Sequence, residues 1–249
     1  MIQFKKKFYC FQLTETWFRL NNSILKNLGL TRYFCVQNPP IKKPLGLHID
    51  LSYTLSIDLN QEIEQIKSKF KSNLKNEINQ GEKIAFEIIF NNDISTFVDF
   101  YNKFAGHKKI YQMNEQMKKA LPQNRFIVGF SKLNGEILSA NLYIFDIDLG
   151  FVRWFLGSSS RLNSDVDKKT IGISNKFLLF KSLIHFKSLN LKKFDFGGYA
   201  ENTTNKSLIG INDFKAAFGG EKEKCISYNS LLYNFLLKIS RKFDRRFTN

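Results

Sequence analysis

The chain has 249 residues, of which 43% are apolar, 15% aromatic and 24% charged, and its formal net charge is +16. This composition is ordinary for a soluble globular protein of one large or two small domains. No stretch approaches the roughly 18 consecutive apolar residues of a membrane span, and the segment that follows Met1 is too short and polar for a secretory signal, so the sequence predicts a cytoplasmic protein.

The positive charge favours an anionic partner, which would be a nucleic acid, a membrane surface or a phosphate-bearing small molecule. A second interpretation is equally open. The excess of Lys, Asn, Ile and Phe is typical of AT-rich genomes, and this drift raises the isoelectric point without selection for binding. Charge alone therefore speaks to association and not to fold.

Cysteine and histidine are few and scattered. No pair of them has the spacing of a zinc site, and an odd number of cysteines leaves one over in any disulfide framework. The residues concerned are Cys10, Cys35, Cys225, His48, His107 and His185. The sequence predicts neither a metal site nor disulfides.

The first half of the chain predicts short strands, a helix and a further strand. Residues 1–50 mix aromatic residues with prolines and predict strands and loops. Apolar residues then recur at helical spacing over 61–81, with Asn60 as the N-cap and Gly81 as the C-terminal stop. The β-branched run over 83–90 predicts a strand.

The second half predicts an antiparallel meander, a helix and one more strand. Asn134-Gly135 between two apolar runs is a strong hairpin signal. The predicted elements are helices over 94–104 and 111–120, strands over 125–132, 137–145 and 150–157, a loop over 158–169, a helix over 173–189 and a strand over 191–196. This order indicates an α+β sheet protein in which a meander leads into a crossover.

The candidate site follows the last predicted strand, which ends in Phe194-Asp195-Phe196 at a glycine pair. Gly197 and Gly198 have no Cβ, so the backbone can approach a ligand closely and turn away from its neighbour. A cleft at the end of this strand is therefore expected. Lys215 lies between two phenylalanines, so its stem can be buried while its ammonium reaches the cleft.

The order of elements and the motifs together resemble the GNAT N-acyltransferase superfamily, in its Fem-like branch of peptidoglycan aminoacyltransferases. The motifs are Phe194 to Gly198, Gly210 to Gly220 and Ile57-Asp58-Leu59 before a lysine-rich helix. The resemblance implies a mixed, largely antiparallel sheet flanked by helices, with a V-shaped split between two parallel strands over 152–156 and 191–196. The sequence divides into three parts: an N-terminal extension or partial GNAT-like subdomain over 1–54, the GNAT-like domain over 55–228, and a basic amphipathic C-terminal helix over 229–249.

In that family acyl-coenzyme A lies in the split, and its pyrophosphate binds at a helix N-terminus with the pattern Gln/Arg-x-x-Gly-x-Gly/Ala. This chain keeps the central glycine but has lysine first and serine last, in Lys169 to Ser174. Backbone amides can still cradle phosphate there. The implied cofactor-binding residues are Lys168, Lys169, Thr170, Ile171, Gly172, Ile173, Ser174 and Asn175. The alternative is a capped helix with a basic first turn.

The catalytic candidates surround the cleft. Asp195 and Glu201 are the candidate bases, and Tyr199 is a candidate acid. Lys215 matches the lysine of a Phe-Lys pair that in Fem-like enzymes contacts the donor or the reacting centre. The alternatives are that Asp195 caps the glycine turn and that Tyr199 only packs.

The candidate substrate-binding residues are Gly197, Gly198, Trp154 and His107. Gly197 and Gly198 form the cleft edge, and Trp154 lies on the neighbouring predicted strand. His107 precedes the polar helix that would roof an acceptor pocket, although a lone loop histidine is usually just exposed.

Three functions are compatible with the sequence. The first is transfer of an acyl group, in particular acetyl, from acyl-coenzyme A to an amine of an amino sugar or cell-envelope precursor, small or lipid-linked. The second is an aminoacyl-tRNA-dependent transfer to a peptidoglycan precursor. The length of the chain favours the first function over this one, because tRNA-dependent Fem-like enzymes resemble two GNAT domains in tandem. The third is a non-catalytic basic module. The C-terminal helix either packs on the protein or lies on an anionic membrane.

Overall fold

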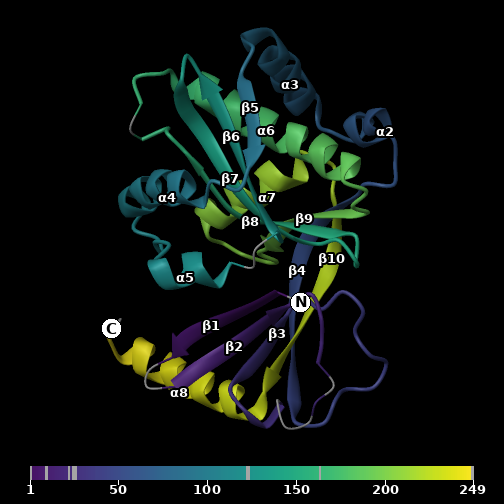
Figure 1. Cartoon of the computed structure of the whole chain (residues 1–249), viewed down its shortest axis with the longest axis vertical. Helices are drawn as coiled ribbons and strands as arrows, with labels where there is room; N and C mark the ends of the chain where they lie inside the picture. Colours follow the sequence, from purple (N-terminus) through teal and green to yellow (C-terminus); the bar gives the residue numbers. More distant parts are fainter. Residues whose placement is uncertain are drawn as a thin grey trace. The chain divides into compact units, whose positions relative to one another are not determined.

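The computed structural model describes residues 2–8, 11–21, 23, 27–121, 124–162 and 164–247, so Cys10 and Pro122 lie outside the described residues. The chain forms two compact units (Figure 1). The terminal unit comprises Met1–Ser52, Lys119–Pro122 and Lys224–Asn249, and the central unit comprises Tyr53–Lys118 and Gln123–Glu223. The sequence predicts the two ends as separate parts, whereas they lie in one unit.

The central unit contains a mixed sheet with the strand order β4-β9-β8-β7-β6-β5. Its strands are β4 (Leu47–Asp58), β5 (Glu87–Asn91), β6 (Phe126–Leu133), β7 (Glu136–Asp146), β8 (Phe151–Ser159) and β9 (Lys193–Tyr199), where β4 enters this unit at Tyr53. Neighbouring strands are antiparallel except β8 and β9. The predicted α+β class and the antiparallel meander are confirmed.

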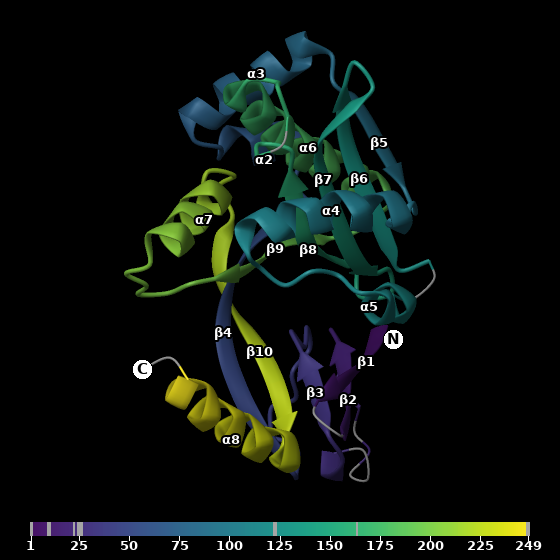
Figure 2. The ribbon, with the colours of Figure 1, turned by 90° about the vertical axis from the view of Figure 1, so that its left-hand side faces the viewer.

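The helices of the inner part of the chain cover both faces of this sheet (Figure 2). They are α2 (Ile63–Ser68), α3 (Ser72–Ile84), α4 (Ile94–Lys108), α5 (Glu115–Ala120), α6 (Lys168–Ser188) and α7 (Lys206–Ala216). Along β7 almost every side chain is buried, which requires cover on both faces because side chains alternate along a strand. The helices α3 and α6 pack together, and α4 packs against β7 and β8.

Two predicted boundaries around the first helix are wrong. The helix predicted over 61–81 is two helices, with Glu62 and not Asn60 as the first N-cap. Gly81 does not end α3, which continues to Ile84 before Ala85 takes a left-handed conformation. Gly81 is needed for packing, because a Cβ there would lie 2.7 Å from the Phe177 ring. The strand predicted from residue 83 therefore begins only at Glu87.

Two further boundaries bear on the site. The helix predicted to begin at residue 173 begins at Lys168, with Asp167 as its N-cap. The strand predicted to end at Phe196 continues through the glycine pair to Tyr199. The hairpin turn is as predicted, since Asn134 and Gly135 both have positive φ, at 52° and 82°.

The terminal unit has its own strands and one long helix. Its strand order is β1-β2-β3-β10, from β1 (Ile2–Phe8), β2 (Phe11–Trp17), β3 (Thr31–Phe34) and β10 (Glu221–Ser230), of which β10 enters this unit at Lys224. A small core of Tyr33, Val36, Leu47 and Tyr228 lies beneath them. The helix α8 (Leu231–Phe247) follows β10 directly. Among the described residues, no helix has the length and apolarity to cross a membrane.

Candidate active site

The parallel strands β8 and β9 separate after three residue pairs. They are in register where Phe151, Val152 and Arg153 lie opposite Lys193, Phe194 and Asp195. Beyond this point β8 continues beside β7, while β9 stays with β4 as far as Tyr199. The predicted V-shaped separation is therefore present, and we call it the β8–β9 split.

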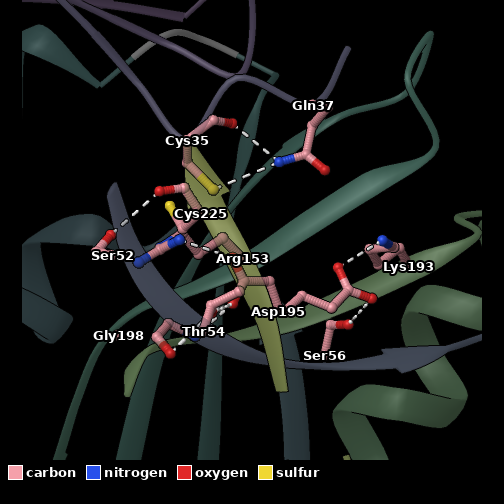
Figure 3. A network of polar contacts seen from close by, with 12 residues as sticks. Cys35, Gln37, Ser52, Thr54, Ser56, Arg153, Lys193, Asp195, Gly198 and Cys225 are labelled. Atoms are coloured by element: carbon pink, nitrogen blue, oxygen red, sulfur yellow. Dashed lines mark hydrogen bonds and ion pairs between the residues drawn. The ribbon is translucent and has the colours of Figure 1, made fainter. Parts of the chain in front are cut away.

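A buried ion pair holds the apex of the split (Figure 3). Arg153 Nη1 donates to Asp195 Oδ2 at 2.7 Å, and the two side chains are 8% and 0% exposed. The Thr54 hydroxyl and the Gly197 amide both donate to Asp195 Oδ1, the amide at 2.7 Å. The lone pairs of Asp195 thus point at donors of the protein itself. A substrate amine would have to displace one of them, so this geometry favours the capping role of Asp195 over the role of a base.

The two glycines of the split differ in what they require. Gly197 has φ +80°, and a Cβ there would lie 3.4 Å from the Trp154 carbonyl oxygen, so this position needs glycine. A Cβ at Gly198 would meet no heavy atom within 4 Å beyond its chain neighbours. Gly197 therefore serves the backbone turn, while Gly198 borders open space.

Lys215 reaches the split from α7. Its Nζ donates to the Gly198 carbonyl at 2.7 Å and lies 6.0 Å from the centre of the Trp154 ring. Asn212, one turn earlier, fixes α7 to the strand end: its amide side chain accepts from Ala200 N at 3.1 Å and donates to Ala200 O at 2.8 Å. The structure therefore brings together Lys215, Gly198 and Trp154, which the sequence predicts as site residues.

The ammonium of Lys215 has an unusual acidity. Burial, together with the nearby Arg153 guanidinium, lowers the pKa of Lys215 from its ordinary 10.5 to about 8, against an opposing effect of Asp195. The side chain is 8% exposed. A buried lysine with a lowered pKa that borders open space is a candidate functional residue.

The remaining catalytic candidates lie at the end of β9, where Tyr199 is the last residue of the strand and Glu201 follows two positions later. Glu201 accepts from Lys222 Nζ at 2.6 Å, and this hydrogen bond lowers the pKa of the Glu201 carboxyl below its usual range, which makes it a weaker base. Tyr199 packs against the core cluster and lies 5.9 Å from Lys222 Nζ. The roles of Glu201 as a base and of Tyr199 as an acid therefore stay predictions.

The start of α6 carries its own anion. The Asp167 carboxylate accepts from the amides of Lys169 and Thr170 at 2.9 and 3.0 Å. These are the amides that would cradle a pyrophosphate, and a carboxylate already compensates the positive end of the helix dipole. The geometry is that of the alternative interpretation, a capped helix with a basic first turn.

The other residues predicted to bind coenzyme A divide by exposure. Ile171, Ile173 and Ser174 are buried, and the Ser174 hydroxyl hydrogen-bonds those of Ser131 and Ser139, each at 2.9 Å. These side chains serve the core. Lys168 and Lys169 are exposed, while Thr170, Gly172 and Asn175 are partly buried.

His107 is not in a loop as predicted. It lies exposed in the last turn of α4, because that helix extends to Lys108. None of the contacts described for residue 107 joins it to the split, so its role in acceptor binding remains a prediction.

No protein-family model and no curated protein matches the chain. Solved structures do match it. A crystal structure of FemX superimposes with a TM-score of 0.66 at 12% identity, over 94% of this chain and 85% of that one. L-PGS from Bacillus licheniformis gives 0.55 at 13% identity, over 88% and 75%. A chain described as the C-terminal domain of a lysylphosphatidylglycerol synthetase from Agrobacterium fabrum gives 0.55 at 12%, over 84% and 70%.

The chain has a Fem-like GNAT fold. At these identities the likeness concerns the fold alone. It agrees with the predicted resemblance.

The sequence analysis did not identify three residues that build the β8–β9 split. Arg153 is the only charged residue within the apolar run 151–156, and that break in the pattern is a signal for a buried ion pair. Thr54 gives no such signal, because its partner Asp195 is 141 residues away in the chain. Asn212 lies inside a predicted motif, but only the structure shows that its side chain makes two hydrogen bonds with the backbone of Ala200.

Proposed function

We propose that this chain is a transferase that moves an acyl or aminoacyl group onto an amine within the β8–β9 split. The observation that carries the proposal is the separation of two parallel strands beside a buried lysine whose Nζ reaches Gly198 O. The likeness to FemX and to L-PGS supports transfer of acyl or aminoacyl groups at this coarse level.

The chemistry is helped by a cation or a hydrogen-bond donor next to the reacting carbonyl. The amine nitrogen attacks the carbonyl carbon, a C–N bond forms, and the C–O or C–S bond to the donor breaks. One proton leaves the amine, and the departing oxygen or sulfur takes one up. We assign the Lys215 ammonium to the negative charge that develops on the carbonyl oxygen, because it is fixed, largely desolvated and borders the open space at Gly198.

Two observations favour an aminoacyl ester over acyl-coenzyme A as the donor. The carboxylate of Asp167 fills the amide nest at the start of α6 and would repel a pyrophosphate. The length of the chain also no longer argues against an aminoacyl-tRNA donor, because the likeness to FemX covers 94% of this chain and 85% of that one. We therefore propose aminoacyl-tRNA as the donor, with the net charge of +16 available for phosphate contacts.

The acceptor is proposed to be an amine of a cell-envelope precursor, small or lipid-linked. Acyl-coenzyme A as donor and an amino sugar as acceptor remain the second candidate, which the central glycine of the Lys169–Ser174 motif favours.

Three glycines with open space at the Cβ position allow a matched test of the donor. Gly198 borders the split, Gly172 lies at the start of α6, and Gly210 lies on α7. The substitution Gly198→Leu should place a side chain where the acyl group binds, whether the donor is aminoacyl-tRNA or acyl-coenzyme A. Leucine at Gly172 should matter only if a pyrophosphate binds there. Leucine at Gly210 is the control for a large side chain at an open glycine.

We expect the wild-type chain to bind charged total tRNA more tightly than the same tRNA after deacylation, at a stated salt concentration. Gly198→Leu should abolish that difference, whereas Gly172→Leu and Gly210→Leu should keep it. Nitrocellulose filter binding measures both affinities. Equal affinity for charged and deacylated tRNA, together with a melting temperature that acetyl-coenzyme A raises and Gly172→Leu makes insensitive, would establish the second candidate instead.

A further inference from the structure

The helix α8 carries apolar side chains on its outside as well as toward the terminal unit. Tyr233 is 6% exposed and packs inward. Leu231, Leu232 and Phe235 are 60%, 45% and 60% exposed. A surface helix normally turns polar residues outward. We call these three residues the outer apolar face.

An apolar loop lies beside the first turn of this helix. Leu231 N donates to the Gly46 carbonyl at 3.2 Å, so the loop that ends at Gly46 meets the start of α8. Within that loop Ile41 and Leu45 are 105% and 76% exposed. Two exposed lysines, at positions 42 and 43, separate them. Exposed apolar residues thus occur in two neighbouring segments of the terminal unit, and the loop also carries two exposed lysines.

The sequence of α8 becomes strongly basic after its apolar start. Residues 238–246 contain five cations, Lys238, Arg241, Lys242, Arg245 and Arg246, against the single anion Asp244, so this part has a net charge of +4. A helix with exposed leucine and phenylalanine beside a basic run fits the interface of an anionic bilayer, where apolar side chains insert and cations meet phosphate head groups.

We propose that the outer apolar face of α8, together with the loop over 41–45, binds the surface of anionic membranes. This inference does not depend on the proposed transferase activity. It places the terminal unit at a lipid surface, without any membrane-spanning segment among the described residues.

Vesicle flotation with the full chain tests this proposal. We expect binding to vesicles that contain phosphatidylglycerol, little binding to pure phosphatidylcholine, and release at high salt. The double variant Leu232→Glu with Phe235→Glu should lower the bound fraction about tenfold, because two inserted side chains are replaced by anions. The matched control is Ile147→Glu with Leu162→Glu, two exposed apolar positions of the central unit, which should bind as the wild type does.

Two further variants test the proposal even if the glutamate variant does not fold. Phe235→Trp should shift its fluorescence to shorter wavelength when phosphatidylglycerol vesicles are added, and Gly198→Leu should still float with the vesicles even though transfer is lost. The proposal is overturned if the folded wild-type chain does not bind anionic vesicles or if the glutamate variant binds equally well. It is also overturned if the outer apolar face forms a dimer that this variant dissociates, as measured by sedimentation equilibrium.

Discussion

Lys215→Met should abolish most of the transfer activity and at the same time stabilise the protein. Loss of one fixed cation at a developing negative charge lowers the rate by about a hundredfold or more. At pH 7 the wild-type chain must hold a buried ammonium whose pKa is lowered from 10.5 to about 8, which costs about 3 kcal/mol. Removal of the hydrogen bond to Gly198 offsets about 1 kcal/mol of this. We therefore expect a gain of about 2 kcal/mol in the free energy of unfolding.

The pH dependence of that gain identifies its cause. Below pH 8 Lys215 is protonated in both the folded and the unfolded state, so the full cost of the buried charge is present. Between about pH 8 and 10.5 the unfolded chain binds the proton more strongly, so wild-type stability rises with pH relative to the variant. Urea titrations of both proteins across this range measure the difference. A gain that stays constant with pH would exclude the lowered pKa as its cause.

Transfer rates give an independent check on the charged form of Lys215. If the ammonium is the active form, kcat/KM of the wild type falls as pH rises through about 8. Lys215→Arg keeps its charge and should lack this falling limb, even if its absolute rate is lower. A wild-type rate that instead rises through pH 8 in a way that the arginine variant does not would assign the neutral amine as a base.

Arg153→Met should be the most destabilising change in the split. It leaves the Asp195 carboxylate, 0% exposed, without its cation, and removal of one partner from a buried pair costs about 3–5 kcal/mol. Arg153→Met with Asp195→Asn should recover most of this loss, because neither member of the pair then carries a buried charge and asparagine can still accept from Gly197 N. Chemical denaturation of the single and double variants measures both effects.

The half-exposed pair of Lys193 and Glu223, which also lies in the central unit, is the control. Its side chains are 38% and 37% exposed, so Lys193→Met should cost no more than about 1 kcal/mol. If Arg153→Met costs as little as Lys193→Met, or if the double variant is no more stable than the single one, the ion pair is not what holds the apex of the split.

Local signals in the sequence predicted much of the central unit. The Asn134-Gly135 turn and the alternating runs around it were enough for the meander. The start of α6 was missed because its first turn is lysine-rich, and the apolar stripe that marks a helix begins only at Ile171. The capping aspartate at residue 167 was the available signal, and it also tells against the predicted pyrophosphate site.

Pairing between distant segments could not be predicted from local patterns. Arg32 lies opposite Asn229 where β3 pairs with β10, so the two ends of the chain build one unit. Two hydrogen-bond donors to Asp195, Thr54 and Arg153, likewise lie far from each other in the sequence. Motifs of neighbouring residues therefore located the glycine pair and Lys215, but not the ion pair beneath them.

The central claim is that the donor's carbonyl lies in the β8–β9 split. A crystal structure of the chain with a non-hydrolysable, amide-linked aminoacyl-adenosine tests it most directly. We predict that the carbonyl oxygen lies within hydrogen-bonding distance of Lys215 Nζ, between Trp154 and Gly198. Binding of the analogue elsewhere, for example in the small cavity lined by Ser56, Lys69 and Glu223, with the split left empty, would contradict the account.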